Sequence, residues 1–279
     1  MDADTEVPTR KAAPMVGTPA LLDEPAPGVR ERVLFLAVIA QLGFMLLVWA
    51  LCAPLVGLFM GKARRGVVGR AAIGFMHRSA WASAEKFGLM HIDASALDTL
   101  AEEPGGLIVA ANHPSMLDAL VIVAHLPRGV CIMKAELMRN LFLGGGARLA
   151  NYIRDDSGRA MVRDAVQTLR DGNQLVCFPE GSRTSKRPVD AFKPGLTLIA
   201  SRARVPIQTV IIEMASPYLG KGWPLLKAPP MPVKIRIRLG ERFLPDDDHR
   251  RMLTRLERYF ARELGQRPSE LQPETAAVV

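Results

Sequence analysis

An uncharged segment of 28 residues, Val33 to Met60, constrains this chain more than any other feature of the sequence. A helix of about 20 apolar residues can cross a bilayer, so the segment is long enough to enter a membrane. It is too long and begins too late for a signal peptide, and a basic cluster follows it in place of a cleavage site. We predict a membrane segment over residues 30–62, either a single tilted span or a hairpin bent near Gly43 or Pro54. Basic residues on both flanks favour the hairpin, with both ends on the cytoplasmic face.

The remaining chain divides by composition into two ends and one large domain. Residues 1–29 contain five prolines and no periodicity, which predicts a disordered N-terminal region, and residues 266–279 are predicted to form a flexible tail. Residues 63–265 form the main domain. Its first part, Gly66–Met90, has apolar residues at helical spacing and is predicted to be a helix.

From His91 onward, short apolar runs alternate with helical patterns. This alternation predicts an α/β domain with a mostly parallel central sheet flanked by helices. The predicted strands are Met90–Ala94, Leu107–Ala111, Val130–Lys134, Asn151–Ile153, Gln174–Phe178, Pro206–Glu213 and Val233–Leu239. One predicted helix begins near Pro114, and three others cover Gly158–Arg170, Pro194–Ala203 and Asp246–Leu264. The strand Val233–Leu239 alternates strictly and should expose its basic residues on one face.

The net charge of +8 suits an anionic surface such as phospholipid headgroups. No zinc-finger spacing or RNA-binding signature is present, so nucleic acid is the weaker candidate. The three cysteines, Cys52, Cys131 and Cys177, lack pairing or ligand spacing and predict reduced thiols in a cytoplasm-facing protein.

The run Asn112–Asp118 joins a predicted strand to a predicted helix and carries a histidine and an aspartate five positions apart. If Asp118 accepts a hydrogen bond from one imidazole nitrogen of His113, the other nitrogen becomes a better base. Such a base could deprotonate an alcohol, whose oxygen then attacks an activated carbonyl. Spacing alone slightly favours the alternative, a structural histidine near a helix cap with Asp118 as a first-turn acid.

Two further segments should reach the same edge of the sheet. Phe178–Thr184 follows a predicted strand and contains a glycine, two hydroxyl residues and Arg183, a combination that could bind an anion or form only a solvated turn. Lys134 follows another strand and could supply a second positive charge. The remaining four histidines have no ligand-like spacing, so no metal site is predicted. Gly144-Gly145-Gly146 is interpreted as a turn, because it lacks the arrangement of a dinucleotide fingerprint.

Together these segments resemble the glycerolipid acyltransferase family, whose type members are the bacterial 1-acylglycerol-3-phosphate acyltransferases. The resemblance covers about residues 87–212 and rests on N-H-x-x-x-x-D at Asn112–Asp118, on Lys134–Leu137 with Arg154 downstream, on Phe178–Thr184, and on Val205-Pro206-Ile207. It implies a membrane-bound O-acyltransferase that transfers an acyl group from acyl carrier protein or coenzyme A to a lyso-glycerolipid, above all 1-acylglycerol-3-phosphate. No cofactor or metal is implied, and membrane lipids are the expected partners at the cytoplasmic membrane.

The resemblance also assigns roles to residues. His113 would be the general base and Asp118 its partner. The substrate-binding residues would be Lys134, Arg154, Glu180, Gly181, Ser182, Arg183 and Thr184. Arg183 and Lys134 would hold the acceptor phosphate.

The chain departs from the family pattern where the acceptor is recognised. Ser182 replaces the commoner threonine, the second block lacks its usual proline, and Thr209 stands where a second proline often lies. Two alternatives therefore stay open. One is an acyltransferase of a specialised lipid pathway, with an aryl-polyene lipid, glycolipid or amino-acid lipid as acceptor. The other is a non-catalytic lipid-binding member of the fold.

Overall fold

The structure, a computed structural model, describes residues 26–185, 189–214 and 216–265, without the side chains of Lys62 and Ala63. Most of the predicted N-terminal region, the predicted tail, Lys186 and Arg187 lie outside these residues.

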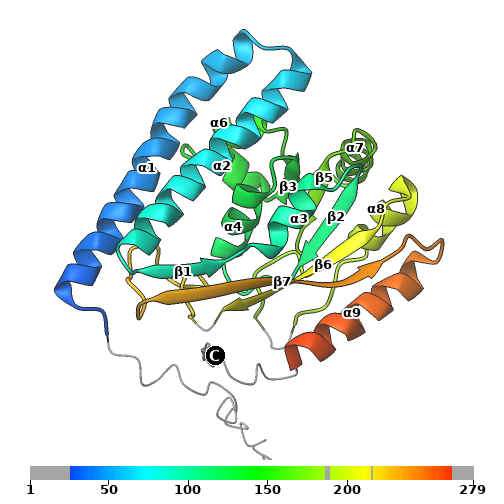
Figure 1. Ribbon diagram of the computed structural model, residues 1–279. Coiled ribbons are helices and arrows are strands. Elements are labelled where there is room, and N and C mark those ends of the chain that lie inside the picture. The colour runs from blue at the N-terminus through cyan, green and yellow to red at the C-terminus, as the bar shows by residue number, and fades with distance from the viewer. Residues whose placement is uncertain (1–25, 186–188, 215, 266–279) are drawn as a thin grey trace, which may run out of the picture.

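The centre of the fold is a seven-stranded sheet in the order β1-β7-β6-β2-β5-β3-β4 (Figure 1). Its strands are β1 (Met90–Asp93), β2 (Leu107–Ala111), β3 (Gly129–Met133), β4 (Ile153–Arg154), β5 (Gln174–Cys177), β6 (Ile207–Met214) and β7 (Val233–Phe243). The strands β2 to β6 run parallel, and the antiparallel pairing of β6 with β7 reverses the direction at one edge. The predicted α/β class and mostly parallel sheet are confirmed.

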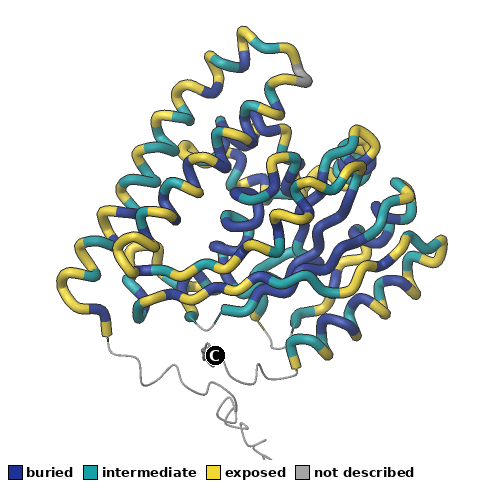
Figure 2. The backbone as a smooth tube through the Cα atoms, viewed as in Figure 1, coloured by how far each residue is buried: buried dark blue, intermediate teal, exposed yellow. Residues whose placement is uncertain are grey.

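Helices cover both faces of the sheet, as the continuously apolar strands require. One face packs against α1 (Val29–Leu58), α2 (Lys62–Lys86), α3 (Ala96–Glu102) and α4 (Leu117–His125). The other packs against α7 (Arg159–Arg170), α8 (Gly195–Ala203) and α9 (His249–Gly265). All five residues of β2 are buried, and Figure 2 shows the buried strands enclosed between the two helical layers. The strand β7 is the predicted exception, because its basic residues Lys234 and Arg236 alternate with buried residues.

The apolar N-terminal segment forms one continuous helix, α1, so the favoured prediction of a hairpin bent near Gly43 or Pro54 is wrong. The helix continues through Gly43 and Pro54, and the chain reverses only after Leu58, so that α2 packs back along α1 (Figure 1). Among the described residues, α1 is the only helix with the length and composition to cross a membrane. Neighbouring helices support α1 where Pro54 removes a backbone hydrogen bond.

The three consecutive glycines do not form the predicted turn, because they open the short helix α6 (Gly144–Leu149). They allow close packing between helices. A Cβ on Gly145 would lie 3.1 Å from the carbonyl oxygen of Ala50, and one on Gly146 would lie 2.7 Å from Nε1 of Trp49. The glycines therefore bring α6 against α1. A second short helix, α5 (Ala135–Arg139), precedes it.

Candidate active site

The candidate site lies where the parallel strands β2 and β5 end next to each other. Ala110 of β2 pairs with Cys177 of β5, so the segments that follow both strands leave the sheet at the same edge. Asn112 extends the contact of β2 with β6, since its amide oxygen accepts from the Ile212 N–H at 2.8 Å and its amide nitrogen donates to the Ile212 carbonyl at 2.9 Å. This buried side chain fixes the backbone immediately before His113.

His113 and Asp118 are in contact, as the sequence predicted. The Nδ1 atom of His113 lies 3.1 Å from Oδ2 of Asp118. The same Oδ2 atom accepts a hydrogen bond of 2.8 Å from the Ser115 N–H, and the Ser115 hydroxyl accepts from the Leu117 N–H at 3.1 Å. These bonds brace the first turn of α4, as the hydrogen bonds of a capping box do. Asp118 is therefore both a first-turn acid of the helix and the histidine partner, so the two interpretations of its spacing describe one carboxylate.

The contacts of the imidazole define its chemistry. When Asp118 is ionised its carboxylate only accepts hydrogen bonds, so in the neutral imidazole Nδ1 of His113 is then the donor and Nε2 carries the free electron pair. The ring is stacked on Phe178, with centroids 3.9 Å apart and an angle of 18° between the planes. Its side chain is 15% exposed, and Nε2 has no hydrogen-bond partner among the described residues. The ring is thus held rigidly, with its basic nitrogen open to a ligand.

Asp118 is fully buried, and burial raises the pKa of its carboxyl. Hydrogen bonds from His113 and Ser115 oppose this rise, because they stabilise the ionised form. The second oxygen, Oδ1, has no hydrogen-bond partner in the described part of the chain. The His113 and Ser115 hydrogen bonds to this carboxylate therefore both fall on Oδ2.

Glu180 joins the segments that follow β2 and β5. Its Oε1 atom accepts from the His113 N–H at 3.3 Å and from the Thr184 hydroxyl at 2.8 Å, and its Oε2 atom accepts from the Asp190 N–H at 2.9 Å. The Thr184 N–H also donates to the His113 carbonyl at 2.8 Å. Because Glu180 is buried and occupied by these donors, its geometry fits a role in shaping the site, while direct contact with a substrate is not indicated.

Gly181, Ser182 and Arg183 of the same loop were also expected to bind the substrate. Gly181 has φ of +69°, a backbone conformation that would strain any residue with a side chain, and a Cβ there would also displace the end of the flexible Lys193 side chain. Ser182 is partly exposed. Arg183 donates from Nη1 to the carbonyls of Leu219 and Gly220, both at 2.9 Å. Part of the predicted phosphate-binding guanidinium is thus occupied within the protein.

The segment 216–220 completes the site and was not predicted from the sequence. The Ser115 hydroxyl donates to the Tyr218 carbonyl at 2.8 Å, and the Met116 N–H donates to the Leu219 carbonyl at 3.1 Å. Leu219 has φ of +54°, which is unusual for a leucine. This strained backbone joins the start of α4 to Arg183, and no local sequence motif predicts it.

Lys134 follows β3 and Arg154 ends β4, so both lie at the carboxyl ends of the parallel strands, as His113 does. In the strand order β3 and β4 come after β5, which places both residues farther from β2. Lys134 is exposed, while Arg154 forms hydrogen bonds of 3.0 and 2.6 Å with the two oxygens of Asp156. The positive charge of Arg154 is therefore balanced locally, and among the described residues neither side chain forms a hydrogen bond or ion pair with His113.

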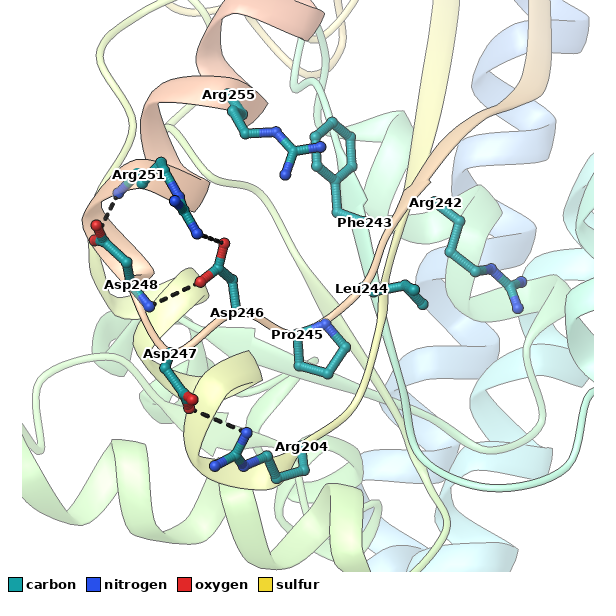
Figure 3. Close-up of a pocket in the computed structure, with 10 residues that line it drawn as sticks. All are labelled: Arg204, Arg242, Phe243, Leu244, Pro245, Asp246, Asp247, Asp248, Arg251 and Arg255. Carbon is teal, nitrogen blue, oxygen red and sulfur yellow. Dashed lines mark hydrogen bonds and ion pairs between the residues drawn. The ribbon is translucent and has the colours of Figure 1, made fainter.

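A hollow of about 760 Å³ lies elsewhere, where β7 turns into α9 (Figure 3). Several of its charged residues pair with one another: Arg204 with Asp247 at 3.0 Å and Arg251 with Asp246 at 2.8 Å. Asp248 caps α9 through the Arg250 and Arg251 N–H groups. Arg242 pairs with Glu103 outside the hollow, and Arg255 lies over the Phe243 ring. We interpret most of these charges as structural contacts.

Residues 91–213 match the family model described as Acyltransferase. This match supports the assignment of the chain to the glycerolipid acyltransferase family. The match contains both the His113–Asp118 pair and the Phe178–Thr184 loop.

Curated relatives support this family assignment. The human 1-acyl-sn-glycerol-3-phosphate acyltransferase beta is 30% identical over 127 residues, 42% of this chain and 45% of that protein. The Saccharomyces cerevisiae 1-acyl-sn-glycerol-3-phosphate acyltransferase is 29% identical over 163 residues, 52% of each chain. The chain thus spans about half the length of the curated relatives it matches.

A solved glycerolipid acyltransferase shares the fold. The crystal structure of the 1-acyl-sn-glycerophosphate (LPA) acyltransferase, PlsC, from Thermotoga maritima superposes with a TM-score of 0.68. It is 21% identical, and the match covers 88% of this chain and 99% of that chain. At this identity the similarity shows the fold alone.

Proposed function

We propose that this protein is a membrane-associated O-acyltransferase that transfers a fatty acyl group from an acyl thioester to the hydroxyl of a lyso-glycerolipid, with 1-acylglycerol-3-phosphate as the first acceptor to test. The observation that carries the proposal is the His113 imidazole, held by Asp118 and Phe178 with Nε2 unpartnered. The names of the matched relatives support the same acceptor.

The reaction follows from this geometry. Nε2 of His113 takes the proton of the acceptor hydroxyl while the hydroxyl oxygen attacks the thioester carbonyl. A carbon–oxygen bond forms and the carbon–sulfur bond breaks. The departing thiolate then recovers the proton from the imidazolium, which Asp118 stabilises in the meantime. The thioester is carried by acyl carrier protein or coenzyme A, and no metal or cofactor is required.

The acceptor phosphate would bind close to the loop after β5. Among the described residues, Nε and Nη2 of Arg183 have no partner and could bind an anion, while Nη1 holds the segment 216–220. Lys134 is exposed and available as a second cation at the same edge. Arg154 is a weaker candidate, because binding a phosphate would require it to leave Asp156.

The exposed side of α1 supports a location at a membrane. Large apolar residues recur every three or four positions along its outer face and include Val33, Leu36, Phe44, Val48, Leu51, Leu55 and Leu58. The opposite side packs on the protein through Phe35, Val38, Ala53 and Gly57. A helix with one side on the protein and one apolar side outward suits a membrane surface. We propose that this surface is the cytoplasmic face of the cytoplasmic membrane.

In the decisive experiment, the purified full-length protein is incubated with a labelled acyl thioester, carried by acyl carrier protein or by coenzyme A. A panel of lyso-lipids and glycolipids supplies the acceptors. Formation of phosphatidic acid from 1-acylglycerol-3-phosphate, identified by mass and absent with folded His113→Ala, would support the proposal. A product only from a non-phosphate acceptor would refute the acceptor assignment. Transfer by folded His113→Ala at the wild-type rate would refute the role of His113.

A further inference from the structure

We infer that a hollow between α1, α2 and α6 binds the phosphate of an anionic phospholipid and anchors the far end of α1 to the membrane. The hollow has a volume of about 550 Å³ and lies away from the residues around His113. Its apolar wall consists of Ala53, Pro54, Gly57, Leu58 and Leu149, with Gly145 at its base. Its polar lining is Arg65, Arg148 and Asn151.

The two arginines are poised for an anion. Arg65 donates from Nε to the Met60 carbonyl at 2.7 Å, and Arg148 donates from Nη1 to the Met138 carbonyl at 2.7 Å. Neither arginine forms an ion pair with a carboxylate in the described part of the chain. Each side chain is therefore held at one nitrogen, while its other donors and its charge are uncompensated. Two such groups in one hollow match the oxygens of a phosphate.

The surroundings identify the phosphate as that of a lipid. The apolar outer face of α1 continues through Leu55 and Leu58 to Phe59, which is 88% exposed. Arg64, which is exposed, lies in the first turn of α2, just after the chain reverses direction. An apolar surface that ends in arginines places those arginines at the level of lipid headgroups when the apolar part is immersed. The wall of the hollow can then contact the start of an acyl chain while Arg65 and Arg148 bind the phosphate.

This site differs from the acceptor site that we propose at His113. The contact of Phe35 with Tyr218 places the N-terminal half of α1 near the segment 216–220, whereas the hollow begins at Ala53. At 1.5 Å per residue, the 22 positions from Phe35 to Gly57 span about 33 Å of helix. The two ends of α1 would thus rest on the membrane at separate points. Because the inference concerns binding alone, it holds or fails independently of the proposed acyl transfer.

The test measures binding of the full-length protein to vesicles of phosphatidylcholine alone and of phosphatidylcholine with phosphatidylglycerol. The double variant Arg65→Gln, Arg148→Gln should lose about thirtyfold in affinity for the anionic vesicles, which corresponds to about 1 kcal/mol for each basic residue. The matched control is Arg250→Gln, Arg258→Gln on α9, which removes the same charge from exposed positions on the other face of the sheet. This control should retain wild-type affinity within about twofold.

Two further measurements make the result decisive. The variant Arg65→Lys, Arg148→Lys should recover most of the binding, since lysine also binds phosphate as a point charge. Thermal unfolding must show that each variant is folded. Equal losses in both glutamine variants would overturn the inference, because net charge alone would then explain binding. Unchanged vesicle binding, with inorganic phosphate bound by wild type and lost in Arg65→Gln, Arg148→Gln, would also overturn it in favour of a soluble phosphate site.

Discussion

Replacing Asp118 with asparagine separates the two tasks of this carboxylate. The Ser115 N–H is a fixed donor that points at Oδ2, so the amide oxygen of Asp118→Asn must occupy that position. The same oxygen then still accepts from Nδ1 of His113, which lies 3.1 Å away. The amide nitrogen replaces Oδ1, which has no partner among the described residues. The variant should therefore keep the correct histidine tautomer and lose only the negative charge.

The size of the effect follows from the strength of the hydrogen bond. A hydrogen bond to an ionised group is about twice as strong as a neutral one, a difference of about 1 to 2 kcal/mol. If that difference falls on the transition state, where the imidazole is positively charged, kcat should drop about 5- to 30-fold. A base with the wrong tautomer would lose about 10⁴-fold. Asp118→Ala removes the acceptor for both His113 and Ser115 and should approach the larger loss.

The assay is acyl transfer to 1-acylglycerol-3-phosphate at saturating donor, with kcat compared among wild type, Asp118→Asn, Asp118→Ala and His113→Ala. Circular dichroism and thermal unfolding establish that each protein is folded. The variants should fall in the order wild type, Asp118→Asn, then Asp118→Ala and His113→Ala together. A folded Asp118→Asn protein as inactive as His113→Ala would refute the reasoning, because the Ser115 N–H would then not control the orientation of the amide.

Three further outcomes follow from the same contacts. Glu180→Gln places an amide donor against the N–H of either His113 or Asp190, which should cost about 1 to 3 kcal/mol and lower the unfolding temperature by several degrees in a thermal scan. Ser115→Ala releases the Tyr218 carbonyl and should destabilise the fold by about 1 kcal/mol in denaturant titration while lowering kcat. Burial raises the pKa of Asp118 above its ordinary 3.8, so stability falls as pH rises through the folded pKa. Asp118→Asn lacks this loss, and its unfolding temperature relative to wild type should be higher at about pH 7 than at about pH 4.

The sheet and the histidine–aspartate contact could be predicted because their signals are local. Buried parallel strands appear as uninterrupted apolar runs, and the predicted Leu107–Ala111 has the bounds of β2. His113 and Asp118 are five residues apart at a strand–helix junction, where one helical turn brings them together. Each of these features depends on fewer than about ten consecutive residues.

The features that were missed depend on contacts between distant residues. Pro54 usually bends or ends a helix, yet α1 continues because α2 and α6 pack along it. In the sequence the triple glycine is typical of a turn, and only the fold shows that α1 packs against it. Ser115 and Tyr218 are 103 positions apart, and no pattern in either segment indicates their hydrogen bond. In the sequence Arg183 is a candidate anion ligand, and only the fold shows that its Nη1 donates to the carbonyls of Leu219 and Gly220.

A short chain of contacts joins the apolar helix to the proposed base. Phe35 of α1 meets the ring of Tyr218 edge-on, with centroids 5.6 Å apart. The Tyr218 carbonyl accepts from the Ser115 hydroxyl, and the Ser115 N–H donates to Asp118, which holds His113. A lipid acceptor that enters beside α1 would therefore meet the same segment, 216–220, that fixes both the base and Arg183. Under the proposed function, membrane contact and catalysis share this segment, so Phe35→Ala should lower transfer to vesicle-bound acceptor more than transfer to a short-chain soluble acceptor.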